Sequence, residues 1–293
     1  MSKSNAVIGP FNRNRHIHID ETSVIHNLIK SDHGVMIDVG AHQGGSLLEF
    51  LDDGWTIYAF EPDDSNRAIL QERLSRHPNK SRVVIDTRCV GRETQSDVAF
   101  FSSKESSGIS SLAAFHQTHV ASQRVDVTTL EILLTEKKLE TVDFLKIDTE
   151  GYDLFVLQGF PWGLGVRPKV IECEFEDAKT IKLGYSFHDL AQFLIEKNYK
   201  VWVSEWHPIL RYGIRHDWRK LERYPCEFGG KDAWGNLLAF DCSFDDVAIV
   251  SVIQACLKRN RFDQRLARVL GHPGKMFSGI ANRAKLLFNS WDL

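Results

Sequence analysis

The chain has few of the features that mark disulfide-bonded, zinc-bound or membrane-spanning proteins. Its five cysteines are odd in number and include no CxxC pair, which argues against a disulfide framework and a structural zinc site. The N-terminal MSKSNAVIGPFNRNRHIHIDE lacks the apolar centre of a signal peptide. No later run approaches the ~18 apolar residues needed to span a bilayer. We therefore expect a soluble protein of the reducing cytoplasm.

A strong charge of one sign is also missing. Lys and Arg total 36 against 39 Asp and Glu, so no general field attracts nucleic acid, and we expect no nucleic-acid partner. Residues 257–293 nevertheless hold eight basic and two acidic residues. This basic tail favours amphipathic helices that pack on the body or on a neighbouring subunit of a homo-oligomer. The alternative is peripheral contact with anionic lipid at the inner face of the membrane.

The GxGxxG motif of dinucleotide-binding proteins is absent as well. In its place, VMIDVGAHQGGSLLEFL leads from an apolar strand through Asp38, Gly40, Ala41, His42 and Gly44 into a helix. Glycines in such a turn allow the backbone to approach a ligand closely. The wider glycine spacing disfavours a pyrophosphate, and Asp38 suits the cationic amino and sulfonium groups of S-adenosylmethionine.

A carboxylate follows the next predicted strand. TIYAFEP ends in Glu61 and Pro62, and Glu61 lies 21 residues after Gly40. An acid about 20 residues past the glycine turn is where a ribose diol is commonly held. The turn and the acid together predict a nucleoside cofactor.

Apolar runs of strand length alternate with helical patterns, which predicts a doubly wound, mainly parallel α/β sheet with helices on both faces. We expect an N-terminal extension over residues 1–30, the main domain over 31–243 and a basic helical extension over 244–293. The predicted strands are Val35–Val39, Thr56–Phe60, Arg82–Ile85, Val142–Ile147, Lys169–Cys173, Lys200–Val203 and Asn236–Phe240. The predicted helices are Ser46–Leu51, Ser65–Leu74, Leu130–Lys137, Asp153–Leu157 and Phe187–Glu196.

Acidic residues follow the strand over residues 142–147, where ligands bind in open α/β sheets. With S-adenosylmethionine as cofactor, the expected reaction is an in-line displacement by an acceptor such as a hydroxyl, which needs to be positioned and to lose its proton. Glu150 could instead stabilise a helix start. A divalent ion could bind Glu172 and Glu174 beside Asp148, but no rigid ligand spacing predicts a metal. The candidate bases are Asp148, Glu150, Glu172, Glu174 and His207.

Two segments interrupt the alternation. The stretch SSKESSGISSLAAF has the composition of a surface loop that could act as a lid. The segment Ser204–Gly235 is too long and aromatic for an ordinary connection, and we interpret it as a substrate-facing insertion that binds a glycan. The alternative is an aromatic cluster that anchors a long loop. The candidate acceptor contacts are Glu172, Trp206, Arg211, Tyr212, His216 and Trp218.

The motifs DVGAHQGG, FEP, VTTLEIL, VDFLKIDTEGYDLFVLQG and IECEF together resemble the FkbM family of methyltransferases, from about Val35 to Asp241. The resemblance implies a class I Rossmann-like fold with a seven-stranded sheet, S-adenosylmethionine as cofactor and O-methylation of hydroxyls such as those of polysaccharide sugars. By position, Asp38 and Gly40 would line the methionine end and Glu61 the ribose. The adenine pocket would contain Asp86, Cys89 and Val90. The family commonly has Asn where this chain has His42.

Two other classes stay open. One is a Rossmann oxidoreductase acting on a nucleotide sugar with a bound dinucleotide. The other is a non-catalytic glycan-binding module with a vestigial pocket. The missing GxGxxG disfavours the first, and the presence of Asp38, Gly40 and Glu61 together disfavours the second.

Overall fold

The computed structural model describes residues 7–13, 17–29, 31–103, 110–112, 119–209, 216–230 and 232–270. The strands are β1 (Val7–Ile8), β2 (Val35–Val39), β3 (Thr56–Phe60), β4 (Val83–Asp86), β5 (Cys89–Val90), β6 (Gln95–Ser103), β7 (His119–Thr128), β8 (Val142–Ile147), β9 (Pro168–Glu176), β10 (Lys200–Trp206), β11 (Trp218–Arg223) and β12 (Trp234–Phe240). The helices are α1 (Glu21–Ile29), α2 (Leu48–Asp52), α3 (Asp64–Ser75), α4 (Leu130–Lys137), α5 (Asp153–Gln158), α6 (Asp177–Thr180), α7 (Phe187–Glu196) and α8 (Asp246–Leu270), with short 3-10 turns at Lys80–Arg82 and Ile181–Leu183.

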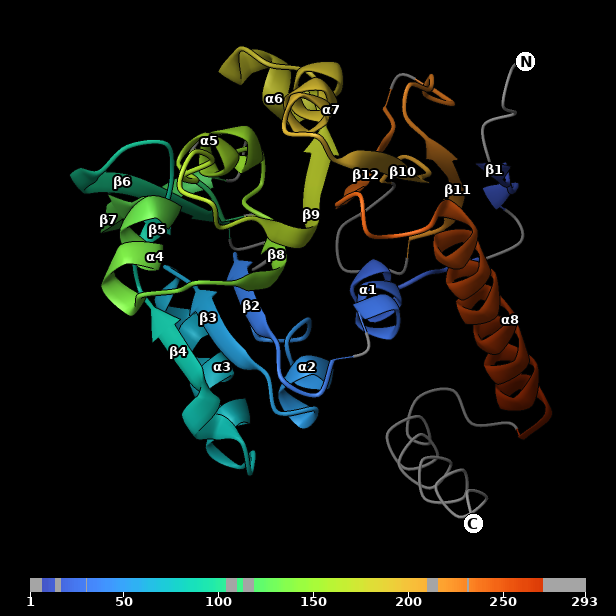
Figure 1. The fold of residues 1–293 in the computed structure, drawn as a ribbon, viewed down its shortest axis with the longest axis horizontal. Coiled ribbons are helices and arrows are strands. Elements are labelled where there is room, and N and C mark those ends of the chain that lie inside the picture. Colours follow the sequence, from blue (N-terminus) through green and yellow to red (C-terminus); the bar gives the residue numbers. More distant parts are fainter. Residues whose placement is uncertain are drawn as a thin grey trace.

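The main sheet is mixed and has nine strands in the order β1-β11-β10-β12-β9-β8-β2-β3-β4 (Figure 1). The strands from β9 to β4 pair in parallel, whereas those from β9 to β1 pair antiparallel. The α/β class and all seven expected strands are confirmed. The count of seven is wrong, because β1 and β11 extend the sheet beyond β10.

Each face of the sheet carries its own apolar core. On one face, α4, α5 and α7 cover residues such as Val39, Ile147 and Cys173. On the other, α1, α2, α3 and α8 cover residues such as Met36 and Phe144. Alternate strand residues point to opposite faces, so Asp38, which shares the face of Met36, is directed into the second core. The expected helical layers on both faces are confirmed.

The N-terminal extension is built into this architecture. Strand β1 pairs with β11, and α1 packs against α8 at one end of the molecule (Figure 1). A second, three-stranded sheet, β5-β7-β6, lies beside α4 and α5. Where the small sheet meets α5, a Cβ on Gly159 would lie 2.1 Å from the carbonyl oxygen of Gly91. No helix in the described residues is long and apolar enough to cross a membrane.

The segment Ser204–Gly235 differs from the expected open insertion. It completes β10, contributes β11 and begins β12, so much of it is sheet. The aromatic density that favoured a substrate-facing loop instead fills the core beneath this half of the sheet. Trp206 and Trp218 of this segment are buried there. Large aromatic side chains bury enough area to stabilise sheet edges in this way.

Candidate functional site

The strand register brings the predicted site residues to one edge of the sheet. Val39 pairs with Phe60 on one side and Ile147 on the other, and Ile147 pairs with Cys173. The following residues Gly40, Glu61 and Asp148 therefore leave their strands at the same carboxyl edge, and Glu174 lies at that edge within β9. This is the edge at which open α/β sheets bind ligands.

Gly40 allows two loops to meet at this edge. Its φ is +84°, and a Cβ there would lie 1.9 Å from the carbonyl oxygen of Asp148. Only glycine permits both the backbone conformation and the contact. His42, two residues later, has φ +50°, a region in which histidine and asparagine are over-represented among non-glycine residues. The loop after β2 is thus fixed against the loop after β8.

Glu61 is held in a defined orientation by the glycine turn. Its Oε2 accepts a hydrogen bond from the backbone N–H of His42 at 2.7 Å, and its Oε1 accepts one from the N–H of Asp63 at 2.8 Å. Burial nevertheless raises the pKa of Glu61 to about 7. Each carboxylate oxygen keeps a second lone pair, so the group can still accept hydrogen bonds from a diol.

Asp38 lies beneath the site and does not form part of its wall. The side chain is fully buried, and its Oδ2 accepts a hydrogen bond from the hydroxyl of Ser46 at 2.6 Å. Its Oδ1 is 3.8 Å from Nζ of Lys146 and has no hydrogen-bond partner among the described residues. Burial raises the pKa of Asp38, against the opposing attraction of Lys146.

Lys146 links this buried acid to the exposed one. Its Nζ is 3.0 Å from Oδ2 of Asp148, whose side chain is 45% exposed. Burial acts to raise the pKa of Asp148, but the charge and hydrogen bond of Lys146 overcome it, and the pKa is lowered. Asp148 is therefore ionised at neutral pH and faces solvent.

A cleft opens above these groups. The predicted residues that line it are Gly40, His42, Glu61, Pro62, Cys89, Val90, Asp148 and Glu150. Asp38, Ala41, Gly44 and Asp86 do not line it. They support it from behind, as Gly44 does through its N–H, which donates to the carbonyl of Ala41. Lining residues that the sequence did not single out include Phe60, Asn66, Arg88, Phe100, Thr149 and Tyr152.

The Asp86–Val90 stretch, which is predicted to form the adenine pocket, contributes one charged residue to the wall of the cleft. Arg88 lines the cleft, while its guanidinium binds the Asp86 carboxylate at 2.7 Å and Glu136 at 3.1 Å. Asp86 is thereby engaged with Arg88. Burial raises the pKa of the Cys89 thiol, so this wall is apolar and uncharged at Cys89.

The Ser-rich stretch also reaches the cleft. Ser110, Ser111 and Leu112 line it, and the Ser111 hydroxyl donates to the carbonyls of Thr149 and Glu150 at 3.3 Å. The neighbouring residues 104–109 and 113–118 lie outside the described residues, so a lid function stays a prediction.

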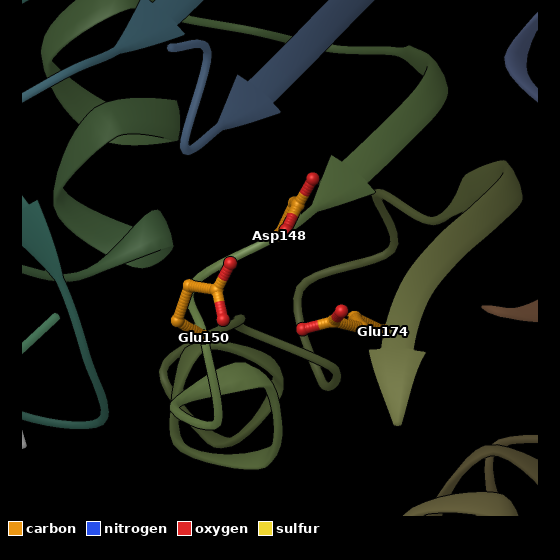
Figure 2. Close-up of side chains that lie close together, drawn as sticks. All are labelled: Asp148, Glu150 and Glu174. Atoms are coloured by element: carbon orange, nitrogen blue, oxygen red, sulfur yellow. The ribbon is translucent and has the colours of Figure 1, made fainter. Parts of the chain in front are cut away.

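Acidic residues gather where Asp148 and Glu150 line the cleft. Figure 2 shows Asp148 and Glu150 from the loop after β8 and Glu174 from β9 around one space. Asp153 anchors this arrangement, since its carboxylate accepts hydrogen bonds from the Thr149 hydroxyl at 2.9 Å and from the backbone N–H of Glu174 at 3.0 Å. Burial raises the pKa of Glu150 to about 7.

Several predicted catalytic and acceptor residues lie away from the cleft. Nε2 of His207 is 2.9 Å from the carbonyl oxygen of Phe11, and His207 does not line the cleft, so its assignment as the base is wrong in this arrangement. Glu172 is buried and accepts a hydrogen bond from Thr22, and burial raises its pKa to about 8. It packs between the sheet and α1 and does not line the cleft.

The tryptophans of the predicted insertion are also structural. The Trp206 indole donates to Glu21 at 2.7 Å, and the Trp218 indole donates to the hydroxyl of Ser204 at 2.8 Å. Both rings are buried, so their interpretation as a stacking surface for substrate is wrong. His216 is half-buried and packs edge-on against Trp234. Arg211 and Tyr212 lie outside the described residues.

Comparison with known families decides the class of this site. The model of the methyltransferase FkbM domain matches residues 38–201, more than half of the 293-residue chain. The chain belongs to the FkbM methyltransferase family. It is thus a methyltransferase that depends on S-adenosylmethionine, and the predicted family and enzyme class are confirmed.

Solved structures similar to this FkbM methyltransferase are also methyltransferases. A methyltransferase FkbM from Methylobacillus flagellatus KT is 19% identical, with a TM-score of 0.43, over 66% of this chain and 44% of that chain. Precorrin-6y C5,15-methyltransferase from Geobacter metallireducens GS-15 is 11% identical (TM-score 0.36; 78% and 96% covered). Human methyltransferase 10 domain containing protein is 15% identical (TM-score 0.37; 77% and 81% covered). This chain thus spans less than half of the Methylobacillus chain. No curated protein matches it.

The chemistry of the cleft fits S-adenosylmethionine. Glu61 offers acceptors to the ribose hydroxyls, and Phe60, Cys89 and Val90 offer an apolar wall to the adenine. The orphaned, buried Oδ1 of Asp38 and the carboxylate of Asp148 supply the negative potential that a cationic amino acid end requires. Each of these contacts stays a prediction for this FkbM methyltransferase.

Proposed function

We propose that this FkbM methyltransferase transfers a methyl group to a hydroxyl oxygen, in particular that of a sugar in a polysaccharide or glycolipid. The observation that carries the proposal is the ionised, partly exposed carboxylate of Asp148 in the same cleft as Gly40 and Glu61. A carboxylate that faces the acceptor can orient a hydroxyl and accept its proton as the oxygen attacks. The cofactor supplies an electrophilic methyl group.

Charge supports a neutral acceptor. Asp148 and Glu150 line the end of the cleft next to Glu174, and they would repel a phosphate or carboxylate brought close to them. A sugar hydroxyl donates a hydrogen bond to such groups and carries no charge. The half-buried pair of His216 and Trp234 offers a further apolar contact at the same carboxyl edge, because Trp234 pairs with Glu176 of β9.

The proposal is tested by replacing the acceptor-facing acid. Asp148→Asn should lower turnover about 100-fold or more, the usual contribution of a positioned base. Affinity for S-adenosylhomocysteine, measured by calorimetry, should fall much less than turnover, because Asp148 supplies only part of the negative potential at the amino acid end and Glu61 and the glycine turn are untouched. Turnover is measured as transfer of a labelled methyl group from the cofactor to neutral sugars and, in parallel, to phosphorylated sugars. Unchanged turnover in the variant, or a preference for anionic acceptors, would contradict the proposal.

Association with a membrane and homo-oligomer formation also stay proposals. The basic residues 271–293 lie outside the described residues. Helix α8 packs its buried Ile249, Ile253 and Leu257 onto the body, so a tail deletion should begin after Leu270. Five of the eight basic residues of segment 257–293 precede Gly271 and remain in this shortened chain, so the full chain is the decisive sample, and absence of its flotation with anionic liposomes would count against the membrane proposal.

A further inference from the structure

The acidic cluster at the acceptor end has the dimensions of a cation site. Asp148, Glu150 and Glu174 each place one carboxylate oxygen within 4.8 Å of the others (Figure 2). Oxygen ligands so arranged are those that Mg²⁺, Mn²⁺ or Ca²⁺ prefer. Three carboxylates this close also repel one another strongly in a partly buried place unless a cation lies among them.

A lysine from the chain itself supplies that cation. Nζ of Lys179, on α6, lies 2.5 Å from Oε2 of Glu150, 3.3 Å from Oε2 of Glu174 and 2.7 Å from Oε2 of Glu176. Its side chain is only 5% exposed. The three N–H bonds of an ammonium group match three carboxylate partners.

The ammonium group and a metal ion would compete for the same oxygens. A divalent ion must come within 2.0–2.6 Å of its oxygen ligands, which is the space that Nζ of Lys179 occupies between Glu150 and Glu174. A buried lysine cannot remain beside a divalent ion at these distances, because the two positive charges repel. The cluster therefore holds one or the other.

We infer that Lys179 takes the place of a divalent metal at the acceptor end, so that this enzyme holds Glu150 and Glu174 in position without metal. Lys179 is a positioning residue that acts through these two acids and leaves Asp148, whose partner is Lys146, to face the acceptor. The assignment of the cluster to the acceptor end rests on the proposed function. The exclusion of metal by Lys179 does not depend on the proposed function.

The inference predicts that removing the ammonium group creates a metal site. Lys179→Met keeps the length of the side chain and leaves the carboxylates without their cation. We expect this variant to bind Mn²⁺ at least tenfold more tightly than the natural chain at pH 8, as measured by the loss of free-Mn²⁺ signal in electron paramagnetic resonance. Lys179→Arg should remain as weak as the natural chain, and Lys179→Met with Glu174→Gln should lose the gained binding.

Two outcomes would overturn the inference. One is a Lys179→Met variant that binds Mn²⁺ no better than its Glu174→Gln derivative, although circular dichroism and S-adenosylhomocysteine binding show that it is folded. The other needs no variant, and consists of tight Mn²⁺ binding by the natural chain that Glu174→Gln abolishes. Failure of the proposed O-methyl transfer would be seen separately, as absent transfer to hydroxyl acceptors with these metal titrations unchanged.

Discussion

Glu61 is the side chain on which cofactor affinity should depend most directly. Both of its carboxylate oxygens accept backbone N–H groups, and it lines the cleft. Glu61→Gln turns one acceptor oxygen into an NH2 group that faces a backbone donor. We expect calorimetry to show at least a tenfold loss of S-adenosylhomocysteine affinity, or about 1.4 kcal/mol.

A matched control for this change lies on α3. Glu72→Gln removes the same charge from an exposed side chain that pairs with Arg76, away from the cleft. Its affinity should equal that of the natural chain. If Glu61→Gln also bound equally well, the ribose assignment would be lost, although the family membership would stand.

The sequence predicted the acidic residues of the site but not the lysines that pair with them. Asp148, Glu150 and Glu61 could be predicted because each follows a strand whose carboxyl end forms the ligand-binding edge. Lys146 and Lys179 gave no such signal. Lys179 lies 29 residues from Glu150 in the chain, and only the fold reveals that they form an ion pair. The residue type of Trp206 and Trp218 likewise does not indicate whether their side chains face substrate or the core.

Strands β10 and β11 and helix α1 share a buried polar network that should contribute to stability and not to acceptor binding. The Ser204 hydroxyl accepts from the Trp218 indole and donates to Glu21 at 2.6 Å. Trp218→Ala should destabilise the fold by about 3–5 kcal/mol, as deletion of a buried aromatic ring does. Trp218→Phe keeps most of the packing and loses the indole N–H, so we expect a smaller loss of about 1–2 kcal/mol.

Urea unfolding followed by fluorescence and circular dichroism measures both losses. Affinity for S-adenosylhomocysteine should be unchanged in the Trp218→Phe variant at a temperature where it is folded. A normal midpoint combined with a raised KM for acceptor would instead restore Trp218 to the substrate site.

The predictable elements share strong periodicity. The strands β2, β3 and β8 and the helices α4 and α7 match their predicted bounds, because apolar alternation or helical spacing is clear and turn residues or caps delimit them. Strand β1 has only two residues, which is too short to show the apolar alternation that predicts a strand. Strand β11 reads WRKLER, whose charges mask its place at the sheet. Its pairing is a tertiary contact that local pattern does not contain.

The whole molecule should lose stability as pH rises above about 5. Burial raises the pKa of Glu21, Glu61 and Asp153 to about 7 and that of Glu172 to about 8, whereas these groups ionise near their ordinary values in the unfolded chain. Between those values the folded protein binds more protons than the unfolded chain, so the free energy of unfolding falls with rising pH. Thermal unfolding should occur at a lower temperature at pH 8.5 than at pH 6.

Glu172→Gln isolates one contribution to this slope. The amide keeps an acceptor for Thr22 and does not ionise. Because one unit of pKa corresponds to about 1.4 kcal/mol, the variant should be more stable than the natural chain at pH 8.5 by at least ~1 kcal/mol. The difference should shrink towards pH 5. Parallel pH profiles for the two proteins would show that Glu172 does not ionise within this range.

The two-residue strand β1 should affect whether the purified protein aggregates. It covers the free edge of β11, pairing Val7 with Glu222 and Ile8 with Leu221. A chain that lacks residues 1–30 but keeps α8 would expose that edge and remove α1 from the buried Glu172 beneath it. Unpaired strand edges recruit other strands, so the shortened protein should aggregate although every cleft residue is present. Strand β1 thus protects the edge of the main sheet from self-association.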